Sequence, residues 1–247
     1  PTSEEGKVGK KTTIGTPQGG VISPVLANVM LNELDQLLDS RGIKFVRYAD
    51  DMVIMCGSKK AAERILENVT NFLEKKLFLK VNKDKTKILH ASEKSQFLGF
   101  GFTTRVNQKK RMQYPTQKYF AIVHEKKRTK FIKRIKLILD RRAPGGIEKV
   151  KSKLKEYVRG WYNYYAEGIP VKWREKANNL IRRRIRQLLW KQWKKPDNRR
   201  KQLMRIGTNI PPLGEFAYSS NSYWRIAKTP LLHRVLGKKS LVKLGWY

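Results

Sequence analysis

The spacing of apolar residues changes near residue 115 of this 247-residue chain. Before that point, stretches with helical spacing alternate with short apolar runs that are typical of strands. After it, the spacing is helical throughout. Helices that alternate with pairs of strands predict an α+β fold, in which an antiparallel sheet carries helices on one face and a helical part follows.

Two amphipathic helices are predicted in the first part. Ser23 and Pro24 supply an N-cap and a helix-starting proline for the first helix, and Gly42 ends it. Ser58 can cap the second helix, whose apolar face should be buried. This face comprises Ala62, Ile65, Leu66, Val69, Phe72, Leu73 and Leu77.

Short apolar runs predict the strands. Residues 43–46 and 52–55 should form a hairpin of buried or half-buried strands, with Tyr48 among the covered residues. A further strand is predicted at residues 87–89. Residues 97–102 alternate aromatic residues with glycines, which predicts a strand with a bulge.

Three helices with short links are predicted in the helical part, and they should form a small bundle. Apolar residues mark them at 131–138, 147–165 and 173–189. We expect Trp161 and Trp173 to lie in the core of this bundle. The remaining residues up to the end of the chain are rich in Pro, Gly, Ser and aromatic residues, and they predict a small irregular module.

The charge of the chain is strongly positive and uneven. Lys and Arg number 55 against 20 Asp and Glu, a formal net charge of +35. Residues 1–110 carry +7, residues 111–195 carry +20, and residues 196–247 carry +8. A polyanion is the leading partner, because each neutralised phosphate releases counterions. No run approaches the roughly 20 apolar residues of a membrane-spanning helix, so nucleic acid is favoured over a membrane.

Cysteine and histidine usage restricts the possible metals. Cys56 is the only cysteine, which excludes an internal disulfide and argues against a zinc module. His90, His124 and His233 are scattered without ligand-like spacing. If a metal binds, we expect a hard ion on oxygen ligands.

Asp50 and Asp51 lie at the predicted hairpin turn, in the sequence YADD of residues 48–51. Aspartate is common in turns because its side chain bonds to nearby backbone, so the pair has an ordinary structural interpretation. Two carboxylates beside buried strands repel each other unless a cation neutralises them. In a basic chain, the arrangement indicates Mg²⁺ held against a nucleic-acid phosphate during phosphoryl transfer.

A glycine-rich loop, GTPQGGVISP at residues 15–24, leads into the first helix. Its glycines would let the backbone approach a template or a nucleotide closely, and Gln18 offers both a donor and an acceptor. The alternative is that the segment is only a helix-entry loop.

The order of these motifs resembles the second half of a reverse transcriptase palm. The QGG loop and YADD hairpin are followed by NKDKT at residues 82–86 and FLGF at residues 97–100. The sequence YVRGWYNYY at residues 157–165 is similar to the thumb, or maturase-specific, signature of group II intron-encoded reverse transcriptases. The tail, with SYWRIA and PLLH, resembles their C-terminal DNA-binding region. The thumb signature distinguishes this family from other reverse transcriptases.

The resemblance implies roles for individual residues. Asp50 and Asp51 would be catalytic carboxylates that bind Mg²⁺. The pocket for template and incoming nucleotide would be lined by Gln18, Gly19, Gly20, Tyr48 and Ala49. Lys85 would stabilise or protonate the leaving pyrophosphate, the alternative being a solvated lysine in a lysine-rich loop. Leu98 and Gly99 would belong to the primer grip.

The resemblance also implies three domains. Residues 1–114 would be the C-terminal part of the fingers and palm, residues 115–195 the thumb, and residues 196–247 the DNA-binding region. Basic residues on the third bundle helix would contact RNA, since arginines can pair with phosphates. They are Arg182, Arg183, Arg184, Arg186, Lys191 and Lys194. The alternative is a merely solvated basic face.

One departure from the family pattern concerns the catalytic carboxylates. Such polymerases need a further aspartate from an earlier strand, yet no aspartate precedes Asp35. We therefore expect the chain to be a C-terminal part of a longer protein and to be inactive alone. The partners would be the missing N-terminal half, group II intron RNA, a DNA target or primer, and dNTPs. The tail has no Cys/His-rich endonuclease module, so if the chain has its natural end here, we expect the protein to use a primer that it does not cut itself.

Two other functions remain open at this point. The chain could belong to an RNA-binding splicing factor with a silent polymerase site, or it could be a basic scaffold of the ribosomal type. The intact Asp50–Asp51 pair favours the polymerase, which would assist splicing of its intron and copy RNA into DNA. We expect a cytoplasmic, nucleic-acid-associated protein of bacteria, with an organelle as the alternative location.

Overall fold

The structure, a computed structural model, describes residues 20–90, 95–106, 108–140, 142, 146–206 and 213–246. The chain divides into two compact units, Pro1–Phe97 and Leu98–Tyr247, here called unit 1 and unit 2. The described part has an α+β fold that is mostly helical and contains two separate two-stranded sheets. No helix of the described part is long and apolar enough to cross a membrane.

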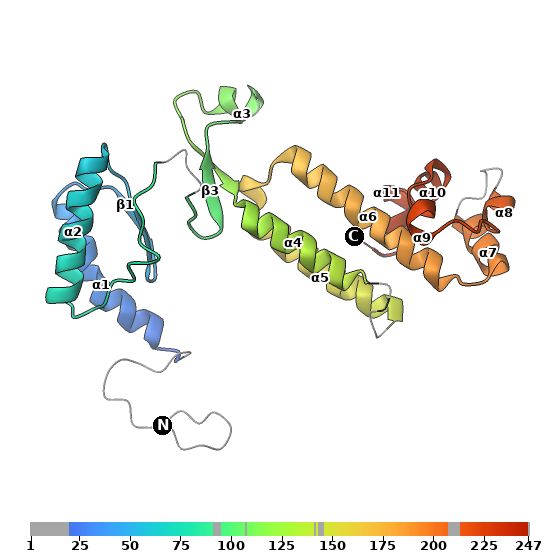
Figure 1. The fold of residues 1–247 in the computed structure, drawn as a ribbon, viewed down its shortest axis with the longest axis horizontal. Helices are drawn as coiled ribbons and strands as arrows, with labels where there is room; N and C mark the ends of the chain where they lie inside the picture. Colours follow the sequence, from blue (N-terminus) through green and yellow to red (C-terminus); the bar gives the residue numbers. More distant parts are fainter. Residues whose placement is uncertain are drawn as a thin grey trace, which may run out of the picture. The chain divides into compact units, whose positions relative to one another are not determined.

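Unit 1 contains a hairpin beside two helices, α1 (Ser23–Ser40) and α2 (Lys59–Lys75) (Figure 1). The predicted helix signals are confirmed: Pro24 lies in the first turn of α1, and Gly42 follows its end with a φ of +64°. The Ser58 hydroxyl caps α2 by accepting a hydrogen bond from the Ala61 N–H at 3.2 Å. The hairpin between the helices is also confirmed, with β1 (Phe45–Tyr48) antiparallel to β2 (Asp51–Ile54).

Two predictions for unit 1 are wrong. Residues 87–89 form no strand, and the polar residues just before them form a turn instead. The apolar face of α2 is only half-buried, because few other elements cover it among the described residues. Of the positions named for this face, only Leu77, just beyond the helix, is buried.

Unit 2 begins with a second hairpin, in which β3 (Phe100–Thr103) pairs antiparallel with β4 (Phe120–Val123). The short helix α3 (Gln108–Gln113) lies between the two strands in the sequence. The predicted aromatic strand is confirmed from Phe100 onward, but a turn at residues 98–99 precedes it in place of a bulge. Because β4 follows residue 115, the prediction of purely helical structure beyond that point is wrong.

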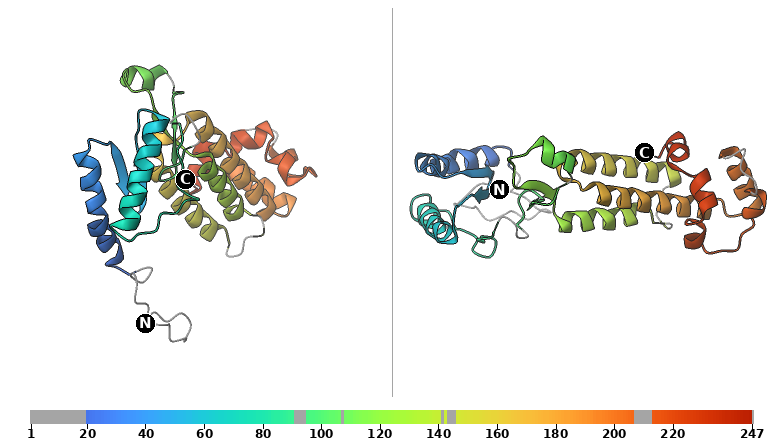
Figure 2. Two further views of the ribbon diagram at one scale, coloured as in Figure 1. Left: turned by 60° about the vertical axis from the view of Figure 1, so that its left-hand side comes forward. Right: turned by 90° about the horizontal axis from the view of Figure 1, so that it is seen from above.

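The three predicted bundle helices are confirmed as α4 (Glu125–Ile138), α5 (Gly146–Tyr164) and α6 (Val171–Gln192). A short 3-10 helix, η1 (Ala166–Gly168), links the last two. Figure 2 shows the three long helices side by side in the view from above. Trp161 and Trp173 are half-buried and pack on Phe131, with ring centroids 4.3 and 5.7 Å from its ring.

The C-terminal segment is helical, so the prediction of an irregular module is wrong. It forms α7 (Pro196–Ile206), α8 (Leu213–Phe216), α9 (Tyr223–Ile226), α10 (Pro230–Val235) and α11 (Lys238–Lys243). Leu203, Leu232 and Trp246 are fully buried in the same hydrophobic cluster as the bundle residues. The bundle and the C-terminal helices therefore share one core.

Candidate catalytic hairpin and nucleic-acid interface

The hairpin of unit 1 presents Asp51 on an open face. The strands pair Tyr48 with Asp51 and Val46 with Val53, and cross-strand partners point to the same face of a hairpin. Val46 is 48% exposed and Tyr48 is 65% exposed. The predicted burial of Tyr48 is therefore wrong, because nothing described in unit 1 covers this face.

The opposite face of the hairpin is fastened to α1 by Arg47. Its Nε donates hydrogen bonds to both carboxylate oxygens of Asp35, at 2.8 and 3.0 Å. Its Nη1 donates to Asn28 Oδ1 at 2.8 Å and to the Ala49 carbonyl at 3.1 Å. Hydrogen bonding to Asp35 raises the pKa of Arg47, which remains charged. Since Ala49 lies in the two-residue turn, with a φ of +53°, this network holds the tip of the hairpin in place.

Sequence reasoning missed the role of Arg47, although a signal existed. Arg47 alternates with exposed neighbours in a strand, so it points to the same face as the half-buried Phe45. A charged residue on the covered face of a strand needs a partner. Asp35, one of few acidic residues nearby in the sequence, is that partner.

Asp50 and Asp51 are both exposed, and neither carboxylate has a hydrogen-bond or ion-pair partner among the described residues. Carboxylate oxygens suit Mg²⁺, which is often held by one or two carboxylates together with phosphates of the substrate. Within the described part of the chain, no cluster of three His, Cys, Asp or Glu side chains could hold a metal. The pair fits a Mg²⁺ site that other ligands would complete.

The other residues predicted for nucleotide binding are only partly described. Gln18 and Gly19 lie outside the described residues, whereas Gly20 lies three residues before the start of α1 and its carbonyl accepts a 3.2 Å hydrogen bond from the Ser23 N–H. Lys85 is exposed in a turn, where its N–H donates to the Asn82 carbonyl at 3.2 Å. Across the described part of unit 1, no ion pair joins Lys85 to the aspartates of the hairpin.

The turn predicted as a primer grip belongs to unit 2 and is fastened to the end of α5. Leu98 and Gly99 both have positive φ, +51° and +86°. The Tyr164 hydroxyl donates to the Leu98 carbonyl at 3.3 Å, and a Cβ on Gly99 would lie 2.5 Å from the Tyr165 hydroxyl. The tyrosines at the end of the YVRGWYNYY motif therefore pack against this turn, a relation that local spacing could not reveal.

Arg186 is a correction to the predicted RNA-binding set. Its side chain is 3% exposed. Its Nε donates to the Ala227 carbonyl at 3.0 Å, its Nη1 donates to the Leu236 carbonyl at 3.3 Å, and its Nη2 lies 2.8 Å from Nε2 of His233. Burial, followed by the charges of Arg182 and Arg183, lowers the pKa of Arg186 to about 10. The residue joins α6 to the C-terminal helices and is not available to RNA.

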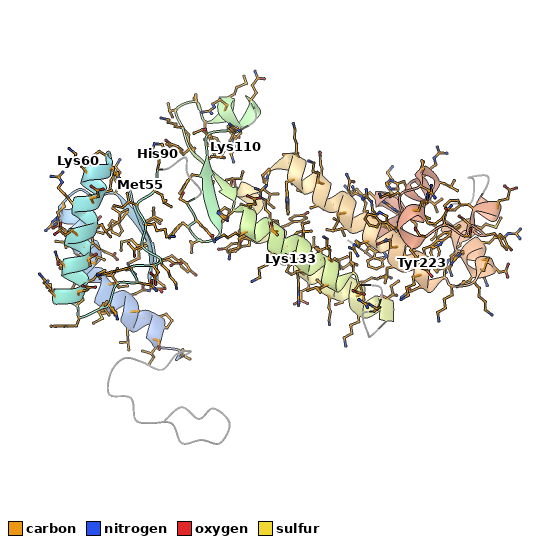
Figure 3. The ribbon with its side chains drawn as sticks, in the orientation of Figure 1. Met55, Lys60, His90, Lys110, Lys133 and Tyr223 are labelled. Atoms are coloured by element: carbon orange, nitrogen blue, oxygen red, sulfur yellow. The ribbon has the colours of Figure 1, made fainter. Side chains whose placement is uncertain are left out.

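The remaining basic residues of α6 reach the surface to different degrees. Lys194 is exposed just beyond the helix, and four others are half-buried: Arg182, Arg183, Arg184 and Lys191. A second basic row, not singled out from the sequence, lies on the exposed face of α4. It consists of Lys126, Lys130 and Lys133, of which Figure 3 labels Lys133. No ion pair neutralises this row among the described residues.

Two family models match the chain. The model of reverse transcriptase (RNA-dependent DNA polymerase) matches residues 2–102 and includes the hairpin with Asp50 and Asp51. The model of the group II intron maturase-specific domain matches residues 128–207, which contain most of the helical bundle.

Three curated relatives are similar to part of the chain. Protein YkfC of Escherichia coli is 32% identical over 151 residues, 47% of this chain and 38% of that protein. The putative COX1/OXI3 intron 2 protein of Saccharomyces cerevisiae is 29% identical over 146 residues, 36% of this chain and 17% of that protein. The group II intron-encoded protein LtrA of Lactococcus lactis is 26% identical over 159 residues, 38% of this chain and 26% of that protein.

The matched segment spans less than half the length of each of these relatives. The two family models follow each other along the chain, and the predicted palm and thumb motifs fall within them. The chain therefore belongs to the family of group II intron-encoded reverse transcriptases that carry a maturase-specific domain.

Proposed function

We propose that this chain supplies the catalytic hairpin and the RNA-binding bundle of an RNA-directed DNA polymerase that also acts as a maturase. The observation that carries the proposal is the Asp50–Asp51 pair, exposed and unpaired on a hairpin within the segment matched by the reverse transcriptase model. In the whole protein, the polymerase would copy RNA into DNA and the maturase would assist splicing of a group II intron.

The hairpin would bind Mg²⁺ through Asp50 and Asp51, with further ligands from outside the described residues. When bound, the ion would neutralise phosphate charge and activate the attacking hydroxyl. Tyr48 shares the open face with Asp51 and would contact the primer end or the nucleotide. Arg47 would hold the tip of the hairpin in a fixed position relative to α1, so that the carboxylates keep one orientation.

The other predicted site residues complete the proposal. Gln18, Gly19 and Gly20 would line the pocket for template and dNTP, and Lys85 would stabilise the leaving pyrophosphate. The turn at Leu98 and Gly99 would grip the primer. Its two positive φ angles and its bond to Tyr164 support a fixed shape for that turn.

Intron RNA would bind the basic rows of the bundle. Exposed lysines on α4 and the accessible arginines of α6 lack neutralising partners within the described part of the chain, and such rows suit phosphates. Target DNA would bind residues 196–247. We retain 1–114, 115–195 and 196–247 as the palm, thumb and DNA-binding segments of this proposal, with the last two built on one core.

The test is primer extension on an RNA template by a full-length protein that contains this chain. Asp50→Asn and Asp51→Asn should each reduce nucleotide incorporation by more than the roughly 10- to 100-fold loss typical of outer-shell metal groups. Asp39→Asn, at an exposed position of α1, is the matched control and should extend normally. Unchanged extension by both hairpin variants would favour the alternative, an RNA-binding splicing factor with a silent polymerase site.

A further inference from the structure

An exposed tryptophan has two cations close to its ring where α6 meets the C-terminal helices. Trp224 on α9 remains 42% exposed. The Arg183 guanidinium carbon, from α6, lies 5.1 Å from the centroid of its ring, and Lys228 Nζ lies 5.0 Å from it. Figure 3 labels the neighbouring Tyr223, which marks the position of α9 beside α6. The indole thus has positive charge close to it and still exposes part of its surface to a ligand.

The surroundings of Trp224 are strongly positive. Burial lowers the pKa of His233, and the nearby charges of Arg186, Arg183 and Arg182 lower it further. Among the described residues, no carboxylate forms an ion pair with Arg183 or Lys228. The buried Nε of Arg183 also has no hydrogen-bond partner within the described part of the chain. Acidic neighbours among the described residues therefore do not neutralise the charges of Arg183 and Lys228.

The cations and the indole are held on one body. Ile185 of α6 and Ile226 of α9 belong to the same buried cluster. Arg186 bonds to the carbonyl of Ala227, the residue just before Lys228. The helices that carry Arg183 and Trp224 are therefore fixed relative to each other, which lowers the entropy lost when a ligand contacts both residues.

A ligand that uses this surface fully offers an aromatic face and negative charge close to that face. An unpaired nucleotide has both, because its base can stack on an indole while its flanking phosphates meet cations. Paired bases in a duplex offer no free face, so a duplex would use only the charges. This reasoning rests on the proposed function in one respect, that nucleic acid is the ligand of the chain.

We propose that Arg183, Trp224 and Lys228 form a subsite for single-stranded nucleic acid, shared by the thumb helix α6 and the C-terminal helices. One unpaired base stacks on Trp224, and the phosphates on its two sides contact Arg183 and Lys228. The proposed thumb, residues 115–195, and the proposed DNA-binding segment, residues 196–247, therefore contact the same nucleic-acid strand at this subsite.

The test uses this chain and labelled oligonucleotides of one sequence: single-stranded RNA, single-stranded DNA, and the RNA duplex. Trp224→Ala should weaken binding of the single strands by about 5- to 150-fold, the range for loss of one stacked base, and should change duplex binding little. Trp224→Phe keeps an aromatic face and should retain most of the affinity. Tyr114→Ala, at a 44% exposed tyrosine that is given no role in binding, is the matched control and should bind normally.

Salt dependence tests the two cations separately. Arg183→Gln and Lys228→Gln should each reduce the slope of log affinity against log salt by about 0.7, the value for one phosphate contact on a single strand. Lys60→Gln, at an exposed position of α2 in unit 1, should leave the slope unchanged. The preferred single strand, RNA or DNA, identifies the natural source of the nucleotide.

Normal single-strand binding by a folded Trp224→Ala protein would overturn the subsite, as would an equal loss for single strand and duplex. If Trp224→Ala fails to fold, unchanged salt slopes in both cation variants would overturn it instead. Failure of primer extension with the Trp224 effect intact would refute the polymerase and not the subsite. Asp51-dependent extension without any Trp224 effect would refute the subsite alone.

Discussion

The two units of the chain differ in how much apolar surface they bury. In the described part of unit 1, the buried apolar residues are Leu34, Leu38 and Leu77, whereas unit 2 holds a continuous cluster from Phe131 to Trp246. The proposed catalytic carboxylates are on the unit with the small core, and the proposed nucleic-acid contacts are on the unit with the large one. A charged network around Arg47 joins the hairpin that carries these carboxylates to α1.

The comparison indicates that nucleic-acid binding and the proposed catalysis need different degrees of rigidity. A surface that grips a long polyanion benefits from a rigid core, because its charges must stay in place over many contacts. A hairpin that lies open on one face can receive template, primer and further protein ligands. Stability is thus expected to vary strongly along the chain.

The largest expected effect comes from the core of unit 2. Ile181 is fully buried in that core, so Ile181→Ala should destabilise unit 2 by about 2 to 5 kcal/mol through lost burial and the remaining cavity. Hydrogen exchange should rise in α4, α5 and α6 and stay unchanged in β1 and β2. Equal loss of protection in both units would contradict the proposed difference in stability between them, because the units would then unfold together.

A smaller effect is expected at the turn that joins β3 to the bundle. Gly99→Ala should cost about 1 to 3 kcal/mol, because Gly99 has a φ of +86° and its new Cβ would meet the Tyr165 hydroxyl at 2.5 Å. Combining it with Tyr165→Phe should recover part of the loss of thermal stability, since the phenylalanine lacks the clashing oxygen.

The matched control for that turn is Gly160→Ala. Gly160 lies within α5, and a Cβ there would have nothing within 4 Å, so the variant should be stabilised by roughly 0.5 to 1 kcal/mol. If Gly99→Ala unfolds at the same temperature as the parent protein, the turn is not fastened to Tyr165 as described.

The hydrogen-bond network of Arg47 in unit 1 should contribute less to the free energy of unfolding than the apolar core contributes in unit 2. Asp35→Asn removes the charged partner of Arg47 and should lower the protection of β1 and β2 by about 1 to 2 kcal/mol, with no change in the bundle. Hydrogen exchange resolved by segment provides the measurement. Asp39→Asn, on the exposed part of the same helix, should leave the hairpin as protected as before.

The smallest expected effect is the pH dependence at His233. Burial and the charges of Arg186, Arg183 and Arg182 lower the pKa of His233 from its ordinary value of 6.5, while a hydrogen bond with the Ala227 backbone opposes them. The unfolded chain therefore takes up this proton at a higher pH than the folded chain does. Unit 2 should lose stability as the pH falls below about 6.5.

His233→Gln should flatten this part of the stability profile. Denaturant unfolding of the parent protein and the variant at pH 7.5 and pH 5.5 measures the difference. If the variant loses as much unfolding free energy between pH 7.5 and pH 5.5 as the parent protein does, the pKa of His233 is the same in the folded and the unfolded chain, which contradicts the prediction.

Local signals predicted much of the fold. Ser58 caps its helix because a hydroxyl at that position can reach the N–H three residues on, and Gly42 stops α1 because it tolerates a positive φ. Apolar spacing correctly indicated the three long helices of the bundle. The YADD hairpin formed where two apolar runs flank a turn.

The features that sequence missed depend on distant partners. The strand β4 is only four residues long, and its partner β3 lies beyond a helix, so apolar spacing could not distinguish it from a helical segment. Arg186 stands in a run of arginines and resembles its exposed neighbours until α9 and α10 cover it. The exposure of Tyr48 likewise depends on what covers the hairpin, not on the residues of the strand.

The most direct test of the account is to measure nucleotide incorporation and RNA affinity together in a full-length protein that contains this chain. Asp51→Asn should abolish RNA-templated incorporation and leave the RNA dissociation constant unchanged. The pair Lys130→Gln and Lys133→Gln should weaken RNA binding and lower its salt slope by about 0.7 per lysine, with incorporation restored at saturating RNA. Normal primer extension by the Asp51→Asn protein would contradict the proposed division between a catalytic hairpin and an RNA-binding bundle. Loss of RNA binding together with incorporation in that protein would contradict it as well.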